Sequence, residues 1–146
     1  MKFIFSFITF LAIGTCFSQD INWKETKNWR LYDIHQSNAF DYKLDTLKNF
    51  ESIALDQDTM QNFLSDVVKW PKDKTSLWMG LYVATCEFPN RKIRKIDISV
   101  YGGFFYDEMT RTYYQLPLAT RNDWLEYLSV NSAKIDHLIK DNEGVF

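Results

Sequence analysis

Cysteine, histidine, glycine and proline are scarce in this sequence, which holds two, two, five and three of them among 146 residues. Cys16 falls in an apolar segment at the start of the chain, so Cys86 is alone in the remainder. A domain with one cysteine has no internal disulfide, and we interpret Cys86 as a small buried strand residue rather than a reactive thiol. His35 and His137 lack the converging ligands that a metal site requires. The composition therefore predicts neither a metal nor another cofactor.

The sequence motifs of common catalytic sites are also missing. Gly102-Gly103 is not followed by the Lys/Ser and helix start of a phosphate loop, and no serine sits in a Gly-x-Ser-x-Gly elbow. The acidic run 56–58 is better interpreted as a helix start than as a calcium loop. With 17 basic and 19 acidic residues, the formal charge is −2. A chain with this charge lacks the excess of basic residues that is typical of nucleic-acid-binding domains.

Residues 1–18 have the layout of a signal peptide. Lys2 precedes an apolar run over 3–13 that is too short to span a bilayer, and the small residues Cys16 and Ser18 precede Gln19. We therefore expect export, followed by one α+β domain over 19–146 without a transmembrane segment. The absence of an Asn-x-Ser/Thr sequon favours a bacterial protein of the periplasm, outer membrane or medium. A lipid anchor at Cys16 is the weaker alternative, because Thr15 fits poorly before a lipidated cysteine.

Hydrophobic periodicity predicts an α+β fold, in which an antiparallel β-meander of three to five strands carries two packed helices. Residues 76–87, 92–101 and the hairpin 104–106/111–116 form the meander, and 29–34 and 52–55 are earlier strand candidates. Asp58 is expected to cap a helix over 59–69. Thr120 is expected to cap a C-terminal helix that could break near Asn131-Ser132.

A turn at 88–91 determines the predicted register of the central hairpin. Pairing Glu87 with Lys92 makes one face wholly aliphatic by setting these residues opposite each other: Val83 and Ile96, Leu81 and Ile98, Met79 and Val100. The 59–69 helix is expected to cover that face. The basic residues of 90–95 are interpreted as a solvated hairpin end, with binding of an acidic partner as the alternative.

Aromatic residues concentrate in the last hairpin, which makes it the candidate binding surface. Because side chains alternate along a strand, neighbouring rings lie on opposite faces. Tyrosine suits a binding face that is partly exposed to water. Packing beneath the C-terminal helix is the alternative role for these rings. The candidate binding residues are Tyr101, Phe105, Tyr106, Arg111, Tyr113 and Tyr114.

Together these features predict an exported, non-catalytic interaction or ligand-binding domain, such as an inhibitor, an immunity protein or an envelope accessory protein. Its partner would be a protein or a small envelope ligand. The alternative is a small exported hydrolase that uses dispersed carboxylates, Asp97 or Asp107 with Glu108. Such carboxylates act as acid and base only where the surroundings raise the pKa of one of them.

Overall fold

The computed structural model describes residues 21–32, 34, 42–71, 80–99, 101 and 103–143, except for the side chains of 80, 81 and 137–143. The predicted signal peptide at 1–18, with Cys16, lies outside the described residues, as do His35, Met79 and Val100.

Seven antiparallel strands form one sheet in these parts of the chain, in the order β2-β1-β4-β5-β6-β7-β3. The α+β class is confirmed, but the predicted count of three to five strands is wrong. Part of the difference is β3, whose two residues pair with the end of β7 and are too few to show an alternating pattern. The strands are β1 (Lys27–Tyr32), β2 (Ser52–Ala54), β3 (Val68–Lys69), β4 (Gly80–Glu87), β5 (Ile93–Ser99), β6 (Phe104–Asp107) and β7 (Thr112–Gln115).

Within the described residues there are two α-helices, α1 (Gln57–Phe63) and α2 (Arg121–Glu143), and three short 3-10 helices, η1 (Trp23–Glu25), η3 (Leu47–Asn49) and η4 (Leu118–Thr120). The predicted bounds of the first α-helix are wrong at both ends. Asp56, not Asp58, is its N-cap, and its Oδ2 accepts hydrogen bonds from the backbone N and Oγ1 of Thr59 at 2.8 and 2.6 Å. At the other end Val68 pairs with β7 instead of continuing the helix, in keeping with the strand preference of β-branched residues.

The C-terminal helix α2 runs without the break that Asn131-Ser132 suggested. Asn131 is buried, and its Nδ2 donates to the carbonyl oxygen of Tyr127 one turn earlier, at 2.8 Å. The polar side chain is therefore satisfied within the helix.

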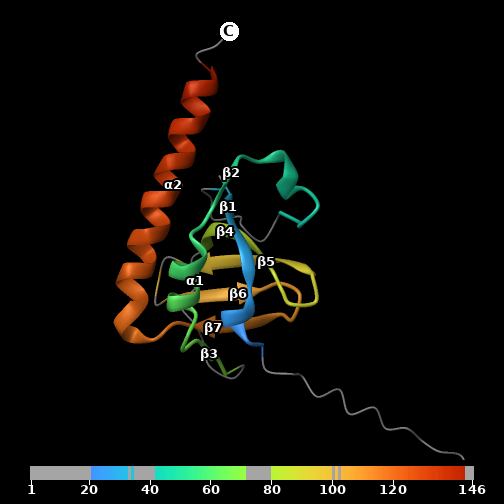
Figure 1. Ribbon diagram of the computed structural model, residues 1–146, viewed down its shortest axis with the longest axis vertical. Helices are drawn as coiled ribbons and strands as arrows, with labels where there is room; N and C mark the ends of the chain where they lie inside the picture. The colour runs from blue at the N-terminus through green and yellow to red at the C-terminus, as the bar shows by residue number, and fades with distance from the viewer. Residues whose placement is uncertain are drawn as a thin grey trace, which may run out of the picture.

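Both α-helices pack on one face of the sheet, which we call the inner face. Figure 1 shows α1 in front of the strands and α2 alongside them, with the C-terminal part of α2 extending beyond the sheet. Met60 and Leu64 join Trp124, Leu128 and Ile135 in one buried cluster with the sheet. The strand residues of that cluster are Trp29, Leu31, Tyr82, Ala84, Cys86, Ile96, Ile98, Phe105 and Tyr114. A smaller cluster on the opposite, outer face joins Val83 to Ile34 and Leu47.

The predicted register of the central hairpin is wrong by one residue. Ala84, not Val83, lies opposite Ile96, and Val83 lies opposite Asp97. The backbone N of Phe88 donates to the carbonyl oxygen of Lys92 at 3.0 Å, so the loop has three residues instead of the expected four. Its last residue, Arg91, has a φ of 60°, the left-handed conformation that closes three-residue hairpin loops. Arginine gives no sequence signal for that conformation.

The chain turns at Gly103, which has a φ of 65° immediately before β6. A Cβ at this position would lie 2.6 Å from Cγ of Arg121, the first residue of α2. The Arg121 Nε in turn donates to the carbonyl oxygen of Leu116 at 3.0 Å. Glycine therefore allows α2 to begin close against the β6–β7 hairpin.

Candidate functional site

The six candidate binding residues do not share one face. Phe105 and Tyr114 lie on the inner face, 1% and 6% exposed, and their rings stack with centroids 5.4 Å apart. Tyr106 and Tyr113 pair across the outer face with centroids 4.6 Å apart. Tyr101 is half exposed outside the strands. Alternation thus places one tyrosine pair half-buried on the outer face and the other two rings in the core.

The β6–β7 turn carries Arg111, which is exposed and has a φ of 52°. Burial, followed by the neighbouring Tyr113, raises the pKa of Tyr106, and the charge of Arg111 acts in the opposite direction. The structure therefore brings together Tyr106, Tyr113 and Arg111 of the candidate residues.

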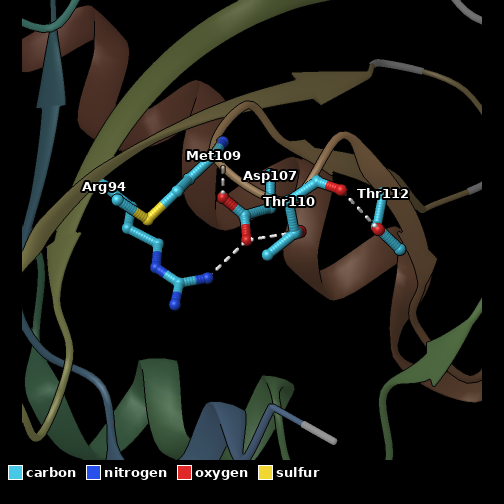
Figure 2. Close-up of polar contacts among 5 residues, drawn as sticks. All are labelled: Arg94, Asp107, Met109, Thr110 and Thr112. Carbon is cyan, nitrogen blue, oxygen red and sulfur yellow. Dashed lines mark hydrogen bonds and ion pairs between the residues drawn. The ribbon is translucent and has the colours of Figure 1, made fainter. Parts of the chain in front are cut away.

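Asp107 holds the same turn closed from the inner side (Figure 2). Its Oδ1 accepts a hydrogen bond from the backbone N of Met109 at 3.1 Å, and its Oδ2 accepts one from Thr110 Oγ1 at 2.7 Å. The same Oδ2 pairs with Nη1 of Arg94 at 2.6 Å. The Asp107 side chain is fully buried, so its carboxylate has a structural role in anchoring the turn.

Arg94 and Lys95 correct the interpretation of 90–95 as a solvated hairpin end. Arg94 is 12% exposed at the side chain, and its Cζ lies 3.8 Å from the centre of the Phe88 ring. Lys95 is buried on the outer face, where its Nζ lies 2.9 Å from Asp97 Oδ1 and 3.6 Å from Glu108 Oε2. Within this segment, residues 90–93 are exposed as expected. A basic run does not reveal which of its members lie beneath another segment.

Asp97 is a carboxylate on the outer face whose pKa is shifted from its ordinary value. It is fully buried, and burial raises its pKa to about 6 even though Lys95 acts to lower it. Oδ2 accepts a hydrogen bond from Lys95 Nζ at 3.1 Å. Oδ1 makes the ion-pair contact without a hydrogen bond among the described residues. Burial combined with a specific charge partner is a recurring property of functional sites.

An open groove of about 580 Å³ lies beside this cluster on the outer face, and sequence reasoning missed it. Three exposed apolar side chains line it: Leu44 at 41%, Ile93 at 54% and Met109 at 56%. They come from the segment before η3, from β5 and from the β6–β7 turn. A second hollow of about 410 Å³ shares Leu44 and Ile93 and extends toward β1 and β4. No local motif links three such distant positions, so the sequence carried no signal for the groove.

The chemistry available to the described residues is limited. Cys86 is buried on the inner face, as expected, and burial raises the pKa of its thiol well above the ordinary value. No three His, Cys, Asp or Glu side chains converge for metal binding within the described ranges. The same ranges contain no helix with the length and apolar character needed to cross a bilayer.

Comparison with protein-family models, curated proteins and solved structures gave no match to the chain.

Proposed function

We propose that the protein is an exported, non-catalytic interaction domain that binds a protein or a small envelope ligand at the groove on its outer face. The observation that carries the proposal is the convergence of Leu44, Ile93 and Met109 on that groove. Exposed apolar side chains gathered in one place often mark an interaction site, whereas scattered ones do not. Export rests on the layout of residues 1–18.

The neighbouring tyrosine pair supports the same surface. Tyr106 and Tyr113 are half-buried on the outer face, and Glu108, which lines the groove, is close enough to contribute to the raised pKa of Tyr106, of which burial is the largest cause. Half-exposed tyrosines offer both a rigid apolar ring and a hydroxyl group to a partner. The groove volume is within the range of small-ligand sites, but its open shape favours a protein segment over an enclosed small molecule.

The three carboxylates proposed for the alternative hydrolase, Asp97, Asp107 and Glu108, do not all lie at the groove. Asp107 is engaged by three donors that close a turn, and Asp97 pairs with Lys95. Neither of these two side chains lines the groove, whereas Glu108 does. An acid–base pair would need both carboxylates at the same reacting group. The geometry therefore favours the binding function.

The test is capture of partners by protein expressed from the full sequence with a C-terminal tag. A benzophenone amino acid replaces Ile93 in one sample and Val130 in the matched control. Val130 is 52% exposed on α2, close to the exposure of Ile93, but lies outside the groove. We expect a crosslinked product from position 93 that is absent from position 130. The product should diminish in Met109→Ser and in Tyr106→Ala.

Two results would contradict the proposal. Crosslinks of the same mass and yield from both positions would remove the groove from consideration. Protein isolated from the source cells with an uncleaved N-terminus that begins at Met1 would contradict the proposed export. Mass spectrometry also separates the two forms of export, because plain cleavage gives a Gln19 start and lipidation gives a modified Cys16 start.

A further inference from the structure

Lys95 is a buried cation shared by two carboxylates of very different exposure. Its side chain is 1% exposed, and its Nζ lies 2.9 Å from Asp97 and 3.6 Å from Glu108. Asp97 is fully buried, whereas Glu108 is 43% exposed and lines the groove next to Met109. The inner partner of Lys95 is thus sealed in the protein, and the outer partner is part of the candidate binding surface.

The charges in this cluster do not balance when both carboxylates are ionised, because one cation faces two anions. Burial is the largest cause of the raised pKa of Asp97, Lys95 acts to lower this pKa, and the negative charge of Glu108 adds a smaller rise. On β4, the residues opposite Lys95 and Asp97 are Thr85 and Val83, which carry no charge. Tyr106, Tyr113 and Arg111 are the other titratable or charged side chains facing the cluster from the described part of β6, β7 and their turn. From the segment before η3, Lys43 and Asp45 line the groove together with Lys95 and Glu108.

We propose that Lys95, Asp97 and Glu108 form a proton-linked switch that controls the position of Glu108 at the edge of the groove. While Asp97 is ionised, it holds Lys95, and Glu108 remains partly in solvent. When Asp97 takes up a proton, the buried charge of Lys95 has Glu108 as its remaining counter-ion. An unpaired buried cation is costly, so the Glu108 side chain moves inward toward Lys95. As regulation of binding this rests on the proposed function, but the switch itself is measurable without a partner.

The test is a pH titration followed by carbon-13 NMR of the side-chain carboxyl carbons, from about pH 4 to about pH 8. We expect the Asp97 signal to titrate with a midpoint near 6. The carboxyl signal of Glu108 and the backbone amides of residues 108–111 should change position at that same midpoint, because the protonation of Asp97 moves the Glu108 side chain. A Glu108 signal that does not change at the Asp97 midpoint would overturn the switch.

Two variants and a control separate coupling from a merely structural role. Glu108→Gln should lower the Asp97 midpoint, because it removes the negative charge that helps to raise it. Asp45→Asn removes an exposed carboxylate of the same groove and should leave the midpoint unchanged. Asp97→Asn should abolish the change in the Glu108 signal near pH 6, because the group that takes up the proton is gone.

The results of these experiments distinguish a failure of the proposed switch from a failure of the proposed binding function. If Asp97→Asn does not fold, Glu108→Gln still decides, because its side chain is partly exposed; an unchanged Asp97 midpoint in that variant refutes the coupling. A switch seen by NMR together with groove variants that capture partners normally would count against the proposed function alone.

Discussion

Replacing Asp107 by asparagine should destabilise the protein more than any surface charge change. The variant Asp107→Asn keeps the size of the side chain and an oxygen that accepts from the backbone N of Met109. It removes the negative charge that lies 2.6 Å from Arg94, at a place where the two side chains are 0% and 12% exposed. The change therefore leaves a guanidinium that is mostly buried without its counter-ion.

The expected loss follows from the burial of this pair. Removing one partner of a buried ion pair costs about 3–5 kcal/mol, since the remaining charge is left uncompensated. Two features place Asp107→Asn at the lower end: Arg94 retains some contact with water, and its Cζ lies 3.8 Å from the centre of the Phe88 ring. We therefore expect a loss of about 3 kcal/mol in the free energy of unfolding. For a domain of this size, that is a fall in Tm of about 10 °C.

The assay is urea unfolding followed by tryptophan fluorescence, for the wild type, Asp107→Asn, Arg94→Met and the double variant. Removing both charges leaves no unpaired ion, so the double variant should be more stable than the sum of the single losses predicts, by at least about 1–2 kcal/mol. Asp45→Asn, an exposed carboxylate, serves as the control and should stay within about 0.5 kcal/mol of the wild type. A loss below about 1 kcal/mol for Asp107→Asn, or additive losses in the double variant, would refute the reasoning.

Three further outcomes test other parts of the molecule. Because burial raises the pKa of Asp97 to about 6 from 3.8, the folded state binds this proton more tightly than the unfolded chain. The wild type should therefore gain about 2 kcal/mol over Asp97→Asn between about pH 7.5 and about pH 4, and parallel stability curves would contradict this. Gly103→Ala should cost about 1–2 kcal/mol, because a φ of 65° disfavours a Cβ that would also approach Arg121; thermal melting measures it, and an unchanged Tm counts against the strain. The Cys86 thiol should react with iodoacetamide only after unfolding, as read from its peptide by mass spectrometry, and rapid labelling of the native protein would disprove its burial.

Much of the hairpin architecture was predictable because side-chain alternation is a local property. The pattern of 92–101 placed Ile96 and Ile98 on one face and Lys95 and Asp97 on the other, and the structure agrees. The pairing of the last hairpin around a short turn was also predictable, since turns depend on a few neighbouring residues.

The first helix and the central register were predicted wrongly for related reasons. Val68 fits a helical stripe by spacing, but pairing with β7 overrides that pattern. Arg91 adopts a left-handed conformation without being glycine or asparagine, and this shortens the loop by one residue. In both cases a tertiary contact or hydrogen bond outweighs the local preference of the residue.

The candidate site was predictable only in part. The aromatic hairpin was identified, and alternation implied that some of its rings would be buried, as Phe105 and Tyr114 are. The groove was not predictable, because Leu44, Ile93 and Met109 are brought together by loops and strands far apart in sequence.

The sequence by itself determined the α+β class and which side chains share a face of a strand such as β5, because the two-residue period of a strand is a property of the backbone. Only the tertiary structure decided that Lys95 and Asp97 are buried together beside an exposed Glu108. Whether a charged side chain on a strand meets water depends on which distant segment lies over it. That dependence is absent from the local pattern, and it produces both the groove and the cluster beside it.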